Sequence, residues 1–222
     1  MSRIGVLALQ GDVREHLQAL DDLGMVPIPI KKPQELENLD GLIIPGGEST
    51  VIDKLSRMYG IAEPLKDKIA DGFPVYGSCA GMIMLADTIA DPTCDLKGNP
   101  QQSFGGIEMV VRRNAFGRQI DSFEVDLVVR GLEKIPSQAR GLEVAPLCGV
   151  FIRAPWVESV GESVEILASI PASNTPVSTE AQQVARIVAV RSGNLLATSF
   201  HPEVSGERRI HELFIHIIRG DA

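Results

Sequence analysis

The sequence predicts a doubly wound α/β fold: a mostly parallel sheet flanked by helices, with an antiparallel extension in the second half. Two observations predict it. In the first half, short apolar runs alternate with segments whose apolar residues recur at helical spacing, as in repeated βαβ units. In the second half, short β-branched runs follow one another between Gly, Pro and Ser residues, which is typical of antiparallel strands. We expect one domain, residues 1–222.

The first half is predicted to contain four strands, at residues 4–9, 25–30, 41–45 and 73–76. Pro27 and Pro29 make the second of these an edge or irregular strand, since proline cannot donate to the ladder. Helical spacing occurs over residues 13–23, 51–58 and 61–69. Asp12 is a candidate N-cap of the first helix, and Gly24 ends it.

The second half is predicted to contain strands at residues 107–111, 123–129, 149–152, 164–168 and 186–190. Residues 191–194, Arg-Ser-Gly-Asn, indicate a hairpin turn into a last strand at 195–200. Apolar residues from Ile210 to Ile218 lie on one face of a final helix. Residues 133–147 and 171–183 have the composition of exposed insertions.

Charge and cysteine content exclude several classes of protein. The formal net charge is −8 and the pI is about 5.0, which argues against nucleic-acid binding. Three cysteines without C-x-x-C pairing, Cys79, Cys94 and Cys148, suggest neither a disulfide framework nor a zinc site. No apolar run approaches the roughly 20 residues that span a bilayer. We therefore expect a cytoplasmic protein that binds neither nucleic acid nor membrane.

Residues 74–84 are the stretch around which the chain is organised. An apolar strand ends in Gly77-Ser-Cys-Ala-Gly81 and an apolar helix follows, the pattern of a sharp turn that exposes one side chain. Gly77 and Gly81 allow the strand and helix backbones to approach. Cys79 would lie at a helix N-terminus, which favours its thiolate form. The alternative is a buried structural cysteine.

His201 is the histidine that best fits a catalytic base. It follows an apolar strand in His201-Pro-Glu203, so its imidazole and a carboxylate can project into one cleft facing Cys79. The alternative is a strand-end histidine packed on Pro202. The other three histidines lie in amphipathic helices and are assigned surface or core roles: His16, His211 and His216.

A glycine pair in Gly46-Gly-Glu-Ser49 also lies between a strand and a helix. Such a peptide can turn its N–H toward a reacting carbonyl group. The alternative is an ordinary βα turn in which Ser49 or Thr50 caps the helix. Because ligands bind beyond the carboxyl ends of parallel strands, this loop and the Cys79 turn can line one crevice.

The Cys79 turn together with His201-Pro-Glu203 resembles the nucleophile elbow and His-x-Glu pair of class I, triad-type glutamine amidotransferases. Further segments narrow the resemblance to one family over essentially the whole chain, the glutaminase subunits of pyridoxal 5′-phosphate synthase. These segments are residues 4–12, 15–16, 45–50, 113–119, 121–123 and 151–155.

The resemblance implies a role for each matching residue. Cys79 would be the nucleophile, His201 the base and acid, and Glu203 its orienting partner. The backbones of Gly47 and Ala80 would form the oxyanion hole. The residues implied to hold glutamine are Gly47, Glu48, Ser49, Arg113, Ile152 and Arg153. Gln10 and Gly11 are candidate contacts with a partner, and neither a cofactor nor a metal is expected.

The implied reaction is hydrolysis of L-glutamine to L-glutamate and ammonia through a thioester. Ammonia would pass to a synthase subunit in a hetero-oligomer that makes pyridoxal 5′-phosphate, vitamin B6. Two alternatives stay open. One is a catalytically silent module that only regulates a partner, and the other is a cysteine peptidase acting alone on γ-glutamyl compounds.

Overall fold

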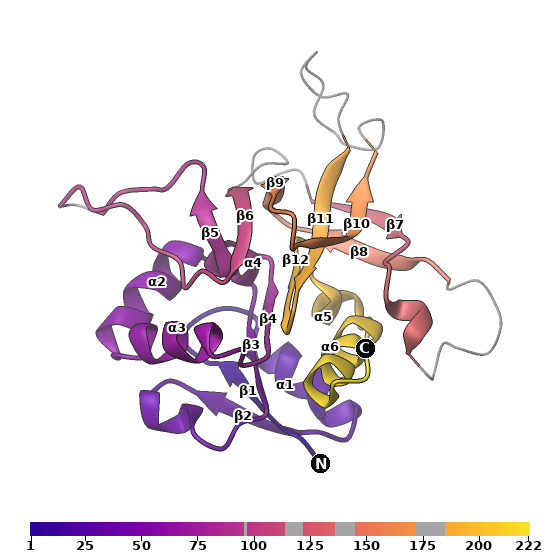
Figure 1. Ribbon diagram of the computed structural model, residues 1–222, viewed down its shortest axis with the longest axis horizontal. Helices are drawn as coiled ribbons and strands as arrows, with labels where there is room; N and C mark the ends of the chain where they lie inside the picture. The colour runs from indigo at the N-terminus through magenta and orange to yellow at the C-terminus, as the bar shows by residue number, and fades with distance from the viewer. Residues whose placement is uncertain (96, 114–121, 136–144, 172–184) are drawn as a thin grey trace.

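The computed structural model describes residues 1–95, 97–113, 122–135, 145–171 and 185–222 (Figure 1). Its strands are β1 (Arg3–Leu7), β2 (Val26–Ile30), β3 (Gly41–Ile44), β4 (Val75–Ser78), β5 (Ala86–Ile89), β6 (Ile107–Arg112), β7 (Phe123–Leu127), β8 (Leu147–Phe151), β9 (Trp156–Val160), β10 (Glu165–Ile170), β11 (Arg186–Ser192) and β12 (Leu195–Thr198). Its helices are α1 (Val13–Asp22), α2 (Ser49–Met58), α3 (Ala62–Ala70), α4 (Ala80–Leu85), α5 (Pro202–Ser205) and α6 (Arg209–Arg219), with 3₁₀ turns η1 (Pro33–Leu36) and η2 (Leu132–Lys134).

The main sheet confirms the predicted fold class. Within the described ranges it has ten strands in the order β2-β1-β3-β4-β12-β11-β9-β6-β5, with β10 paired to β11. Strands β2, β1, β3, β4 and β12 are mutually parallel. Beyond them, β12, β11, β9 and β6 pair antiparallel to one another, while β7 and β8 form a separate antiparallel pair. The first half therefore builds most of the parallel part, the last strand β12 completes it, and the second half supplies most of the antiparallel extension.

Side chains of the parallel strands alternate between two cores. On β3, Ile43 faces the core shared with α1 and α6, whereas Leu42 and Ile44 face the core shared with α2, α3 and α4. Tyr76 and Val75 on β4 divide in the same way. Figure 1 shows α2 and α3 on one side of the strands and α1, α5 and α6 on the other. Helices thus cover both faces, as a doubly wound sheet requires.

The structure confirms some of the predicted elements and adds others. Strand β2 is an edge strand, as its prolines indicate, and the hairpin at 191–194 joins β11 to β12. The sequence does not predict β5 and β9, because both are short and mix apolar residues with polar ones. The predicted insertions at 133–147 and 171–183 fall largely outside the described residues.

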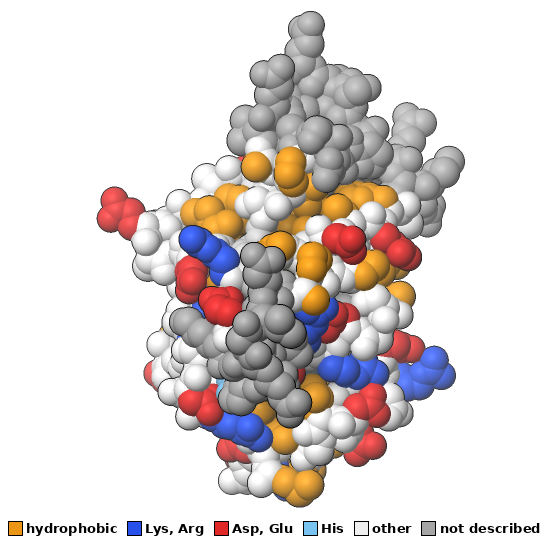
Figure 2. Space-filling model, turned by 90° about the vertical axis from the view of Figure 1, so that its right-hand side faces the viewer, with side chains coloured by type: hydrophobic (Ala, Val, Ile, Leu, Met, Phe, Trp, Pro, Cys, Tyr) orange, Lys and Arg blue, Asp and Glu red, His pale blue; other side chains and the backbone are white. Residues whose placement is uncertain are grey.

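The surface carries charged side chains of both signs, as expected from a sequence with 21 Lys and Arg and 29 Asp and Glu residues. Figure 2 shows acidic and basic side chains interspersed over the lower part of one face, with hydrophobic side chains gathered higher up. Across the part of the chain that the structure describes, no helix has both the length and the apolar character needed to span a bilayer.

Candidate active site

Four neighbouring parallel strands, β1, β3, β4 and β12, end at one edge of the sheet and carry the candidate site. A cavity of about 210 Å³ opens at this edge, where parallel sheets bind their ligands. Nine residues that the sequence singles out line the cavity: Gly47, Glu48, Ser49, Cys79, Ala80, Arg113, Ile152, Arg153 and His201. Three others lie outside the lining: Gln10, Gly11 and Glu203.

Cys79 occupies the turn between β4 and α4 with a positive φ, at φ 48° and ψ −98°. Such a conformation is uncommon for a residue with a side chain and persists only where the surroundings hold it. Two glycines allow it. A Cβ on Gly77 would overlap the backbone of Gly81, and a Cβ on Gly81 would overlap the carbonyl oxygen of Ile44. Strand and helix therefore approach as closely as the sequence predicts, and Cys79 projects at the start of α4.

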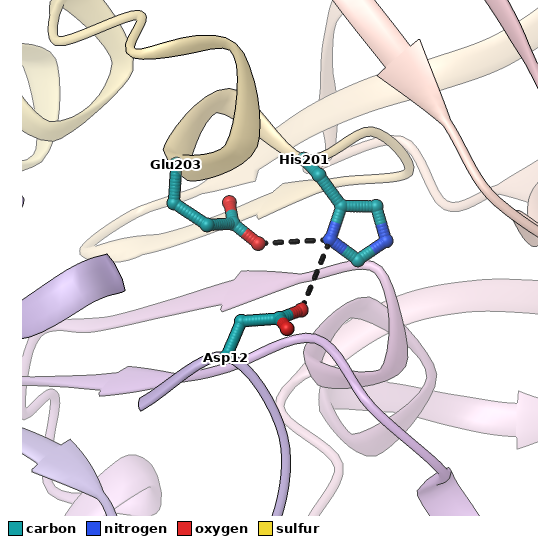
Figure 3. Close-up of side chains that lie close together, drawn as sticks. All are labelled: Asp12, His201 and Glu203. Carbon is teal, nitrogen blue, oxygen red and sulfur yellow. Dashed lines mark hydrogen bonds and ion pairs between the residues drawn. The ribbon is translucent and has the colours of Figure 1, made fainter. Parts of the chain in front are cut away.

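His201 follows β12 and meets two carboxylates with one ring nitrogen. Its Nδ1 lies 2.8 Å from Oε1 of Glu203 and 3.4 Å from Oδ2 of Asp12, as Figure 3 shows. Glu203 is fully buried and also accepts a hydrogen bond from the Ser78 hydroxyl group, 3.2 Å from Oε2. The other ring nitrogen points away from both carboxylates (Figure 3). Nδ1 is thus held by carboxylates while Nε2 is left for chemistry.

The surroundings of His201 favour its protonated form. Burial lowers the pKa of the imidazole, but hydrogen bonds to Asp12, Cys79 and Glu203 outweigh burial and raise that pKa to about 12. Cys79 and His201 line the same cavity, and the raised pKa favours an imidazolium there at neutral pH. A thiolate next to an imidazolium is the arrangement that activates cysteine for attack.

Asp12 lies at the predicted N-cap position but has a further contact that the sequence does not predict. It occupies the N-cap position of α1 but makes no side-chain capping hydrogen bond. Its backbone N–H donates to the carbonyl oxygen of Gly46, 3.1 Å away, and its carboxylate lies 3.4 Å from Nδ1 of His201. The ligand atoms of Asp12, His201 and Glu203 lie within 4.8 Å of one another, so the three could also hold a metal ion.

The glycine pair is held by the loop after β1. The backbone N–H of Glu48 donates to Oε1 of Gln10 at 2.7 Å, and Gly47 has φ +152°, which favours glycine. A Cβ on Gly11, at φ +101°, would overlap the carbonyl oxygen of Gly46. The alternative of a turn capped by Ser49 or Thr50 is wrong, because Glu48 occupies the N-cap position of α2.

Arg113 forms one wall of the cavity and is almost completely buried. Its Nη2 donates to Oε1 of Glu48 at 3.0 Å, and its Nη1 donates to the Thr93 hydroxyl group at 2.7 Å. The Ile152 carbonyl oxygen, also at the cavity, lies 4.0 Å from Sγ of Cys79. The cavity therefore presents acidic, basic and backbone groups, which suits a ligand that carries both an ammonium and a carboxylate.

Sequence reasoning missed four residues of this region: Asp12, Ile83, His16 and His211. Asp12 and Ile83 line the cavity. His16 and His211 are fully buried behind Glu203, with His16 Nε2 3.6 Å from Oε1 of Glu203. Asp12 could have been found, because it follows the strand that ends beside the cavity. The two histidines belong to helices whose spacing indicates only burial.

Comparisons with known proteins agree with this geometry. The chain is 63% identical to the pyridoxal 5′-phosphate synthase subunit PdxT of Arthrobacter sp. (strain FB24) and 60% identical to that of Paenarthrobacter aurescens (strain TC1), covering 99% of this chain and 93% of each relative. A crystal structure of a glutamine amidotransferase matches 97% of this chain and 98% of its own, with 41% identity and a TM-score of 0.78. The family model of the SNO glutamine amidotransferases matches residues 6–219. The chain therefore belongs to the SNO glutamine amidotransferase family.

Proposed function

We propose that this chain is the glutaminase subunit of a pyridoxal 5′-phosphate synthase, hydrolysing L-glutamine to L-glutamate and ammonia and delivering the ammonia to the synthase subunit. One observation carries the proposal: Cys79, at φ 48° on its turn, shares a cavity with His201, whose Nδ1 lies 2.8 Å from Glu203. The relatives named PdxT, which match nearly the whole chain, support the assignment to this synthase. Three free thiols support a reducing, cytoplasmic setting.

In the first step, the Cys79 thiolate attacks the side-chain amide carbon of glutamine. The carbonyl oxygen becomes an oxyanion, and backbone N–H groups of Gly47 and Ala80 stabilise it. The His201 imidazolium then transfers a proton to the amide nitrogen, the C–N bond breaks, and ammonia leaves. Cys79 is left as a thioester with the glutamyl group.

In the second step, neutral His201 takes a proton from water while the water oxygen attacks the thioester carbon. The C–S bond breaks and returns the thiolate, so glutamate leaves and His201 is again protonated. Glu203 holds Nδ1 through both steps and stabilises the imidazolium each time it forms. Arg113 and Glu48, with backbone groups at 47–49 and 152–153, would hold the α-carboxylate and α-ammonium groups of glutamine.

Delivery to a partner makes chemical sense, because ammonia free in neutral solution is mostly protonated and lost as a nucleophile. Hydrolysis without a partner would waste glutamine, so we expect the partner to switch the site on. The Gln10 side chain, which holds the N–H of Glu48 beside the glycine pair, is the candidate sensor, with Gly11 next to it. Docking there would release the loop and let Gly47 complete the oxyanion hole.

The test is a glutaminase assay on the purified chain, with and without the synthase subunit, measuring glutamate release. We expect turnover that rises when the synthase subunit is added and is absent in Cys79→Ala. A thiol-reactive glutamine analogue gives a second measurement: stoichiometric labelling of Cys79 supports an enzyme. No labelling, even with the synthase subunit present, would indicate a silent regulatory module instead. Turnover of γ-glutamyl compounds without any partner would favour a peptidase.

A further inference from the structure

Two histidines that the proposed mechanism does not use lie directly behind the candidate triad. His16 on α1 and His211 on α6 are both 0% exposed, and Nδ1 of His16 is 2.9 Å from Nε2 of His211. On its other side, Nε2 of His16 faces Oε1 of Glu203 at 3.6 Å. Glu203 in turn binds His201. Side chains from α6, α1, α5 and the end of β12 thus form one buried column that leads to the cavity.

Aromatic packing fixes the two rings of this column. The Tyr76 ring meets His16 and His211 edge to face, with ring centres 6.1 Å and 5.9 Å apart. The Tyr76 hydroxyl group is itself bound to Oγ1 of Thr198 at 2.8 Å. A half-turn of either ring would keep this packing, so the contact between Nδ1 of His16 and Nε2 of His211 is what sets the nitrogen that each ring presents to the other.

Both histidines are neutral in the folded protein. Burial, the neighbouring His211 and His201 rings and the Arg208 guanidinium lower the pKa of His16 well below its usual value. Burial and Arg208 lower the pKa of His211 to about 3. A neutral imidazole has one N–H donor and one acceptor nitrogen, so the pair must donate in one direction along the column.

The carboxylate of Glu203 decides that direction. With the proton of each ring on Nε2, His211 donates to His16 and His16 donates to Glu203, leaving Nδ1 of His211 as the end acceptor. With the proton of each ring on Nδ1, His211 could donate to the backbone carbonyl group of Glu207. His16 would then direct the lone pair of Nε2 toward the Glu203 carboxylate, which is repulsive. A hydrogen bond to an ionised acceptor is roughly twice as strong as one between neutral groups, so the first arrangement is favoured.

We propose that His211 and His16 are positioning residues: a one-way hydrogen-bonded column that donates to Glu203 and so fixes the carboxylate that orients His201. The proposal rests on the glutaminase function proposed above. The nitrogen Nε2 of His16 has no other hydrogen-bond partner within the residues described. The 3.6 Å distance from Nε2 of His16 to Oε1 of Glu203 is longer than a hydrogen bond, so the column requires this contact to shorten when glutamine binds, as catalytic hydrogen bonds do.

The variant test uses the full chain with its synthase subunit and measures kcat and KM for glutamine. His16→Phe keeps a ring but removes the donor, and His16→Gln restores an amide N–H near the position of Nε2. We expect kcat of His16→Phe to fall about 10- to 100-fold through misplacement of His201, with KM nearly unchanged. His16→Gln should recover most of this loss. The matched control is His216→Gln, since His216 contacts Asp221 and not the column, and it should keep wild-type kcat.

These outcomes separate the proposal from the function on which it depends. A wild-type complex without glutaminase activity refutes the proposed function. An active wild type with a His16→Phe variant that keeps wild-type kcat refutes the column. If folded His16→Phe and His16→Gln lose kcat equally, the proposal is also refuted. In that case the N–H donor that Gln restores makes no difference to His201, and the role of His16 is structural only.

A second measurement needs no variant and covers the case in which His16→Phe does not fold. Nitrogen-15 NMR of the histidine rings in the wild-type protein at neutral pH reports which ring nitrogen carries the proton. We expect His16 and His211 both to be neutral with the proton on Nε2. A proton on Nδ1 of His16 would reverse the column and overturn the proposal.

Discussion

Acidification should destabilise the fold through His211, and the size of the effect follows from its burial. In the unfolded chain this histidine binds a proton below a pH of about 6.5. In the folded protein, burial and Arg208 lower its pKa to about 3, so the folded state stays unprotonated over this interval. Between pH 6.5 and 3 the unfolded state therefore binds more protons, and stability falls as pH falls.

The magnitude at pH 5 is worked from these two values. Each pH unit below 6.5 costs about 1.4 kcal/mol, so lowering the pH from 7 to 5 should remove about 2 kcal/mol through His211 alone. Urea unfolding of wild type and of His211→Gln, followed by fluorescence of the single tryptophan, Trp156, measures it. The drop in unfolding free energy between pH 7 and 5 should be about 2 kcal/mol smaller in His211→Gln.

His216→Gln is the matched control for this experiment, because it removes a histidine from the same helix without touching the buried pair. Its loss of stability between pH 7 and 5 should exceed that of His211→Gln, because the buried pair is intact. If His211→Gln loses the same amount as the wild type, then His211 takes up a proton in the folded state, and the account of a neutral column fails.

Three further outcomes test the site and the fold. Cys79→Ala should lower glutaminase activity by at least about a thousandfold while the synthase subunit still binds, as measured by size-exclusion chromatography; higher residual turnover would count against a covalent route. Arg113→Lys should raise KM for glutamine about tenfold with a smaller change in kcat, because lysine cannot contact Thr93 and Glu48 together; an unchanged KM would remove Arg113 from glutamine binding. Gly81→Ala should destabilise the fold by about 1–3 kcal/mol, seen as a lower Tm, because its Cβ would overlap the carbonyl group of Ile44; an unchanged Tm would mean that the turn can relax.

The fold class could be predicted because the physical signal is local. The parallel strands are mostly short apolar runs, as in Gly41–Ile44, and the helices that follow β1 and β3 have a clear 3.6-residue period. Strands β5 and β9 lack such a signal. Ala86–Ile89 has two exposed polar residues, and it pairs only because β6 lies alongside. Its strand conformation is thus set by tertiary contact rather than by its own sequence.

The candidate site could be predicted in part for a similar reason. Cys79 and His201 each follow a recognisable strand, so topology alone brings them to one edge. Asp12 follows β1 and so could be placed at the same edge, but its hydrogen bond to Gly46 joins loops 34 residues apart in the chain and has no counterpart in the sequence pattern. The pairing of His16 with His211 spans 195 residues. Helical spacing assigns both histidines a surface or core role and does not predict which residues they contact.

The antiparallel half of the sheet has a direct part in building the site. The nucleophile and the base must follow neighbouring strands at the same end of the sheet. Strand β12 can run parallel to β4 only if the chain first reaches the other end of the sheet, where β4 begins. The hairpin from β11 provides this reversal, since β11 is antiparallel to β12 and returns the chain to the amino end of β4. Residues 195–198 then align with 75–78 in register, one for one. A change of register in that hairpin would move His201 relative to Cys79 by about 3.3 Å per residue, more than a hydrogen bond can span. The precision of the catalytic pair therefore depends on a turn at Gly193, far from the cavity.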